Sequence, residues 1–180
     1  KRKNQLTKAE AAGQATIDAW KAVGAARGSD GAKLAGEWQL YFADKFYFAK
    51  FEPFAITKAA KTLDEVKKQQ ADIKAVTTAT QDKYLALDAY GVAEYSMAAK
   101  VRFGETTQKY AQKLSEAPIP VPISKSPDAV ATFEEQRDKN LVKYLNEARA
   151  QWSEVVSAAR QGGISNKWSQ LAQENLAREF

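Results

Sequence analysis

Apolar residues recur every three or four positions along most of this chain, a period that indicates α-helices. No segment shows the alternation of apolar and polar residues that is typical of a β-strand. The pattern predicts about six helices, at residues 7–27, 31–51, 63–90, 92–116, 127–161 and 166–179. We therefore expect an all-α fold of stacked antiparallel helical hairpins, forming a single domain over residues 1–180.

Short polar signals predict where several helices begin and end. Thr7 with Glu10, and Thr62 with Glu65, each match the capping box, in which both side chains bond to free amides at a helix N-terminus. The further expected ends are an Asp30 cap, a Ser126–Pro127 start, a Gly162–Gly163 stop and a Ser165 cap.

The second predicted helix is unusually rich in aromatic residues, and it ends in the sequence FYFAKFEPF at residues 46–54. Its bulky side chains fall on three sides of a helical wheel, which indicates a helix buried nearly all round. On this interpretation Phe42, Phe46 and Phe51 are all core residues. The alternative is that Tyr41 and Phe48 line an exposed groove and are the candidate residues for binding a partner peptide.

Two long apolar stripes predict helices that pack lengthwise against neighbours. The stripe from Leu63 to Leu87 follows a coiled-coil spacing but contains polar residues at Gln70, Thr77 and Thr80. The other stripe runs nearly unbroken from Val130 to Ala159. We expect an antiparallel partner helix within the chain for the first stripe, in preference to free dimerisation.

The sequence PIPVPISKSP, at residues 118–127, holds most of the prolines. Proline favours extended backbone, so we expect an ordered, non-helical crossover that lies against the helices. The alternative is a ligand for a domain that recognises proline-rich peptides.

The residue types that most enzymes use are absent or poorly placed. The chain has no histidine and no cysteine, which excludes serine–histidine triads, thiolate nucleophiles and the usual zinc sites. It also lacks a phosphate-binding loop. The neighbouring carboxylates Glu134 and Glu135 would point about 100° apart on a helix, so they would not share a substrate. We therefore expect no enzymatic activity, no catalytic residues, no cofactor and no metal.

The formal net charge of +5 and the pI near 9.2 describe a mildly basic chain. Because lysines and arginines are interspersed with acidic residues, the composition does not favour a nucleic-acid footprint. A basic nucleic-acid-binding helical protein is the alternative function. No apolar run has the length of a membrane span. The start at Lys1, without methionine, leads us to expect a C-terminal fragment of a longer chain.

Two short patterns resemble the tetratricopeptide repeat. Phe103-Gly104 and Thr107 occupy the places of Leu-Gly-x-x-Tyr on the first helix of that repeat. Ala148, Trp152 and Val155 resemble the Ala-x3-Phe-x2-Ala pattern of the second helix, although a proline-rich insertion separates the two helices. The resemblance implies a tetratricopeptide-like α-solenoid.

About half of the chain is similar to periplasmic tetratricopeptide-type proteins of deltaproteobacteria, including myxobacterial gliding-motility proteins. The similarity rests on residues 89–123 and on GGISNKWSQLAQENL near the C-terminus, with Ala117-Pro118-Ile119-Pro120, Trp168 and Asn175-Leu176 at matching places. It implies a non-enzymatic protein–protein interaction scaffold in a cell-envelope assembly. It also implies a periplasmic location and protein partners from an envelope complex.

Overall fold

The structure is a computed structural model that describes residues 2–178, except for the Arg2 side chain. All the regular elements in this part of the chain are helical, which confirms the prediction of an all-α fold. They are α1 (Arg2–Val23), α2 (Asp30–Phe46), η1 (Tyr47–Phe51), α3 (Leu63–Leu85), η2 (Ala86–Tyr90), α4 (Ala93–Ser115), α5 (Val121–Ser124), α6 (Pro127–Gly162) and α7 (Lys167–Ala177).

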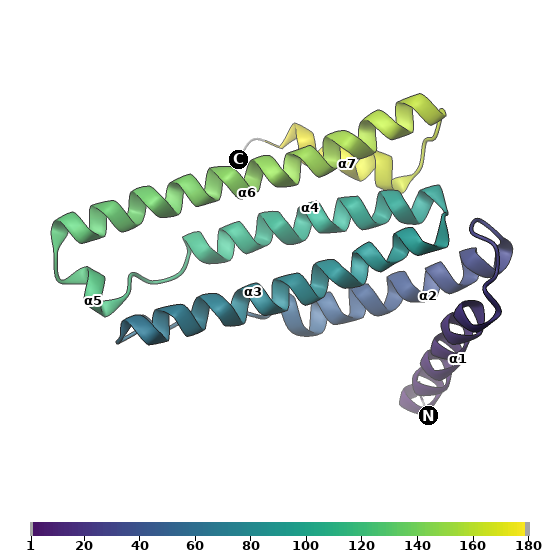
Figure 1. Ribbon diagram of the computed structural model, residues 1–180, viewed down its shortest axis with the longest axis horizontal. Coiled ribbons are helices and arrows are strands. Elements are labelled where there is room, and N and C mark those ends of the chain that lie inside the picture. The colour runs from purple at the N-terminus through teal and green to yellow at the C-terminus, as the bar shows by residue number, and fades with distance from the viewer. Residues whose placement is uncertain (1, 179–180) are drawn as a thin grey trace.

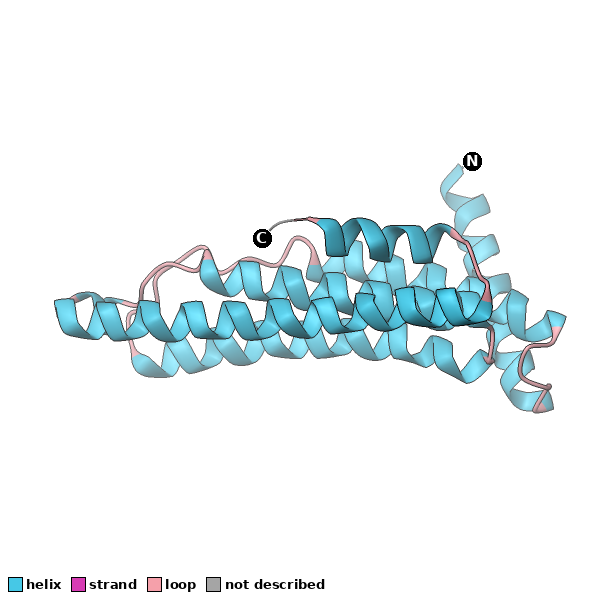
Figure 2. Cartoon of the chain, turned by 90° about the horizontal axis from the view of Figure 1, so that it is seen from above, coloured by secondary structure: helices cyan, strands magenta, loops and turns pink. Residues whose placement is uncertain are grey.

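Three long helices lie side by side and form one layer of the molecule. Figure 1 shows α4 between α3 and α6, and α4 packs against both of them. Figures 1 and 2 show α2 and α7 on one face of this layer, while α1 packs against α2 and its N-terminus projects away from the other helices. No helix in the described part of the chain combines the length and the hydropathy needed to cross a membrane.

Glycines let bulky rings approach the helix backbones. A Cβ atom placed on Gly104 of α4 would lie only 2.5 Å from Nε1 of Trp152, a fully buried residue of α6. Gly13 of α1 similarly accommodates the ring of Trp38 from α2. Only glycine fits such contacts, so these positions bring helices close together.

Several predicted helix ends are confirmed. Thr62 is the N-cap of α3 and accepts a hydrogen bond from the amide of Glu65 at 3.2 Å. The Glu65 carboxylate in turn accepts from the amide of Lys61, one residue before the cap. Ser126 caps α6 with Pro127 at its first position, and Gly163 ends that helix with a φ of 61°.

Other predicted helix ends are wrong. In two cases a residue next to the predicted cap is the N-cap instead. Ser29 rather than Asp30 caps α2, and Asn166 rather than Ser165 caps α7. Helix α1 already begins at Arg2, so Thr7 is an interior residue whose hydroxyl donates to the carbonyl of Lys3. The range 7–27 therefore starts too late, and it also ends too late because α1 stops at Val23 before a left-handed Gly24.

The aromatic second helix is less buried than predicted. Tyr47 and Phe51 lie in the core, in a π-helical turn that continues α2. Phe42 and Phe46 are only partly buried, so the prediction that they are core residues like Phe51 is wrong. No neighbouring helix covers them completely, and the aliphatic chain of Lys83 brings its ammonium over the Phe46 ring.

The proline-rich segment is an ordered crossover with one helical turn. Residues Val121–Ser124 form α5, which corrects the prediction of a wholly non-helical segment. The amide of Val121 donates to the carbonyl of Ala60 at 2.9 Å, so the crossover is joined to the segment that precedes α3. Pro120 beside it is buried.

Candidate functional site

A groove runs along α4 between α3 and α6, and we call it the α4 groove. It contains a first cavity of about 220 Å³, near the beginnings of α3 and α6, and a second cavity of about 180 Å³. Tyr144 of α6 lines both cavities, so they are adjacent, and Ile56, Pro118 and Pro120 also line the first cavity.

The floor of the α4 groove is one face of α4. Phe103, Thr107 and Tyr110 contribute to the second cavity, and Ala111 and Leu114 to the first. Thr107 and Leu114 are seven residues apart, which is about 10.5 Å along an α-helix. Thr107 and Leu114, one from each cavity, are therefore spaced like two residues one heptad apart on a helix lying along the groove.

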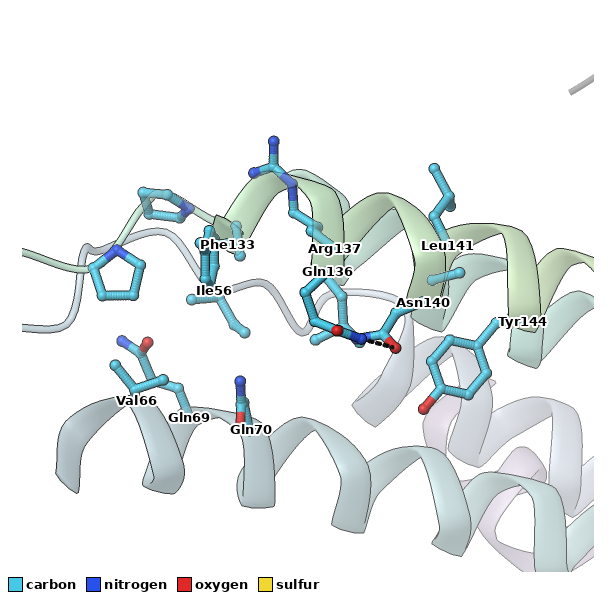
Figure 3. A pocket seen from close by; sticks show the side chains of 15 residues that line it. Ile56, Val66, Gln69, Gln70, Phe133, Gln136, Arg137, Asn140, Leu141 and Tyr144 are labelled. Carbon is cyan, nitrogen blue, oxygen red and sulfur yellow. Dashed lines mark hydrogen bonds between the residues drawn. The ribbon is translucent and has the colours of Figure 1, made fainter. Parts of the chain in front are cut away.

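The walls of the first cavity combine apolar groups with neutral amides. Figure 3 shows Val66 and Gln70 of α3 extending towards α6, while the Tyr144 hydroxyl extends towards α3. Gln136 donates to Asn140 at 3.2 Å along the opposite wall (Figure 3). These groups can both donate and accept hydrogen bonds.

Within the described part of the chain, Arg137 is the one formally charged residue that lines the first cavity. Its guanidinium stacks on the ring of Phe133 at 5.9 Å, and Figure 3 shows its terminal nitrogens pointing away from α3. The buried Nε has no hydrogen-bond partner among the described residues. The arginine thus contributes mainly its apolar stem to the cavity.

The second cavity is organised by contacts across α4. Gln81 of α3 donates to the Thr107 hydroxyl at 3.0 Å, and the Tyr110 and Tyr144 rings meet edge to face at 5.1 Å. Burial raises the pKa of Tyr110 to about 12, and the neighbouring Tyr144 adds to this shift. Lys74 and Glu147 lie on the two sides of the cavity, one on each flanking helix.

The groove exists because the long α6 stripe is only half covered. Its second half is fully buried, as Ala148 and Trp152 show, whereas Phe133, Leu141 and Tyr144 in the first half keep part of their surface accessible. The other helices that pack along the layer, α2 and α7, lie on its opposite face (Figure 2). Within residues 2–178, the helices that pack against α6 are α4, α7 and the single turn α5, so no long helix besides α4 covers the first half of its stripe.

A smaller cleft, of about 200 Å³, lies among η1, α4 and α7. The α4 residues that line it, Arg102, Glu105 and Lys109, lie on roughly the opposite side of α4 from the groove floor. Arg102 donates to Glu105 at 2.8 Å, and Lys109 donates to Glu52 at 2.8 Å. Because these charges are already paired, the cleft is best described as a network that joins the three elements.

The structure does not bring the two predicted partner-binding residues into one site. Phe48 is 54% exposed and lines the smaller cleft. Tyr41 is 37% exposed, and its hydroxyl donates to Glu10 of α1 at 2.7 Å. Neither residue lines the α4 groove. A role for both residues in binding a partner peptide stays a prediction.

The sequence contained one signal for the α4 groove. Of the polar residues in the α3 stripe, the exposed Gln70 lines the first cavity. Thr77 lines the second cavity but is buried like Thr80, and both hydroxyls donate to carbonyls four residues earlier in α3. An exposed polar residue in an apolar seam, such as Gln70, marks a place where a neighbour does not cover the helix. The residues from α6 carried no such signal, because the stripe from Val130 to Ala159 looks nearly unbroken.

Comparisons with protein-family models, with curated proteins and with solved structures found no match for this chain.

Proposed function

We propose that this chain is a non-enzymatic protein–protein interaction scaffold, and that the α4 groove binds an α-helix of a partner protein. The observation that supports this proposal is the pair of adjacent cavities between α3 and α6, whose floor residues Thr107 and Leu114 are seven residues apart. A helix that lies in an apolar groove inserts side chains at positions i, i+3 or i+4, and i+7. The spacing of about 10.5 Å suits the first and last of these positions.

The architecture adds support for a repeat-like scaffold. Helices α4 and α6 pack closely where Gly104 meets Trp152, and these residues carry the resemblance to the tetratricopeptide repeat. We propose that α4 and α6 form such a hairpin and that the whole chain is a tetratricopeptide-like stack. The resemblance also motivates our proposal of an envelope assembly of the gliding-motility type, in the periplasm.

A helical-peptide library displayed on phage tests the proposed function. Peptides are selected on the purified chain, and their affinities are then measured for two variants of α6. Leu141→Glu places a charge in the first cavity, whereas Val142→Glu places the same charge on a neighbouring residue that is 58% exposed and does not line the groove. We expect the first variant to weaken binding at least tenfold and the second to leave it nearly unchanged.

Equal binding to the two variants would contradict the proposal, because the peptides would then bind elsewhere. Circular dichroism and a thermal melt of each variant show whether it is folded. If Leu141→Glu does not fold, Gln70→Trp offers a second test, since Gln70 is an exposed residue on the α3 wall and its replacement obstructs the same cavity.

A further inference from the structure

We infer that the partner helix presents an uncharged face to the first cavity, with apolar anchors at positions i and i+7 and neutral polar residues beside the first anchor. This inference rests on the proposed function and specifies the chemistry of the partner. It follows from the composition of the groove, in which the two cavities differ in charge.

The anchor positions follow from the apolar surface of each cavity. Leu114, Phe133 and Leu141 offer aliphatic and aromatic surface in the first cavity. Phe103 and the paired rings of Tyr110 and Tyr144 do so in the second. Covering this surface with apolar side chains removes it from water, which is the main favourable contribution to binding in such grooves.

The exclusion of charge follows from the polar groups of the first cavity. The polar side chains of α3 and α6 that line it are amides and the Tyr144 hydroxyl, apart from Arg137. The terminal nitrogens of Arg137 point away from the α3 wall (Figure 3), and no carboxylate of the described residues lines this cavity. A partner lysine or arginine seated here would lose water without gaining an opposite charge, which is unfavourable. An aspartate or glutamate beside the α3 wall would also lose water, because the terminal nitrogens of Arg137 point away from that wall.

Neutral polar side chains of the partner suit the same walls. The exposed Gln70 amide extends into the groove, while Gln69 donates to the carbonyl of Lys58 and Gln136 donates to Asn140. An asparagine, glutamine, serine or threonine of the partner can form hydrogen bonds with the Gln70 amide. It can also bond to the side-chain oxygens of Gln69 and Gln136 and to the side-chain nitrogen of Asn140, which these two hydrogen bonds do not use. The second cavity has Lys74 on one side and Glu147 on the other, so it does not exclude a charge of either sign in the same way.

The same displayed library tests this inference when all twenty amino acids are allowed at the positions that face the groove. Sequencing before and after selection on the wild-type chain gives the enrichment of each residue type. We expect apolar residues to be enriched at two positions seven residues apart. We expect charged residues to be depleted at least tenfold at the positions around the first anchor.

A charge change in the wall gives a second, independent readout. When the peptide library is selected on the Gln70→Glu variant, we expect to recover peptides with lysine or arginine at one position beside the first anchor. The matched control is Gln173→Glu, the same substitution at an exposed residue of α7 outside the groove. Peptides selected on the control should keep the wild-type preference.

The possible failures are distinguishable. If selected peptides bind Leu141→Glu as well as the wild type, the α4 groove is not their site and the proposed function fails. Suppose instead that the peptides require the groove but carry charged residues around the first anchor as often as the starting library does. The proposed function then stands, and the inference of an uncharged face is wrong. The inference is also wrong if Gln70→Glu selects no basic residue.

Discussion

Arg102 of α4 forms an ion pair with Asp44 of α2, with Nε 3.2 Å from Oδ1. The same carboxylate oxygen accepts a hydrogen bond from the Tyr84 hydroxyl of α3 at 2.8 Å. The guanidinium also donates to Glu105 and lies over the ring of Trp168 in α7. One carboxylate and one guanidinium thus connect α2, α3, α4 and α7 behind the floor of the α4 groove.

Asp44→Ala should therefore destabilise the fold. It removes one partner of the partly buried Arg102 and the acceptor of the buried Tyr84 hydroxyl, and hydrogen bonds to charged groups contribute about 1.5–3 kcal/mol each. We expect a loss of that size in the free energy of unfolding, measured by urea denaturation. The control is Asp30→Ala, which removes a carboxylate that is 99% exposed in its pair with Lys33 and should have little effect. Equal effects would contradict the structural role of Asp44.

Gly104→Ala should destabilise the chain although alanine favours helices. The new Cβ would lie 2.5 Å from Trp152 Nε1 and 3.1 Å from the Ala148 carbonyl, and such overpacking costs about 1–3 kcal/mol. Gly31→Ala is the matched control, since its nearest contact would be an ordinary 3.8 Å and its helix propensity would improve. Thermal melts should show a lower Tm for the first variant and an unchanged or higher Tm for the second.

Phe51→Ala and Phe48→Ala should differ strongly in stability. Phe51 is fully buried, so its truncation should cost about 3–5 kcal/mol of unfolding free energy. Phe48 is 54% exposed, and its truncation should cost less than about 1 kcal/mol. Guanidinium unfolding curves provide the measurement. A cost for Phe48→Ala close to that for Phe51→Ala would show that the wrong side of this turn has been assigned to the core.

Alkaline pH should weaken the fold through Tyr110. Its pKa is raised from 10.0 to about 12 in the folded chain, so the unfolded state loses this proton first. The contribution of the protonated Tyr110 hydroxyl to the free energy of unfolding is complete below pH 10. It is lost as the pH rises from 10 to about 12. Urea unfolding at several pH values should show a smaller alkaline loss for Tyr110→Phe than for the wild type. Identical pH profiles would contradict burial of this hydroxyl.

Hydrogen exchange should show that the proline-rich crossover is part of the folded unit. The Val121 amide donates to the Ala60 carbonyl and should exchange more slowly than in an unfolded peptide. Exchange followed by mass spectrometry over residues 118–127 provides the test. Exchange at the rate of an unfolded peptide would mean that this segment is a linker between separate units.

Features that depend on neighbouring residues could be predicted from the amino-acid sequence. The helical period requires only local spacing, and the ends at Thr62, Ser126 and Gly163 depend on side chains or φ angles within a few residues. The same local reasoning failed at Thr7, where a matching pattern lies inside a longer helix. A capping sequence permits a helix to begin but does not prevent the preceding residues from being helical.

The coverage of each apolar face, in contrast, depends on the tertiary arrangement of the helices. Phe42 and Phe51 look equivalent in the sequence, yet only Phe51 of the two faces enough neighbours to be fully buried. Likewise, the α6 stripe is continuous in sequence but fully buried only in its second half, where α7 packs against α6 in addition to α4. Burial depends on helices that are distant along the chain, and so the α4 groove is a property of their arrangement.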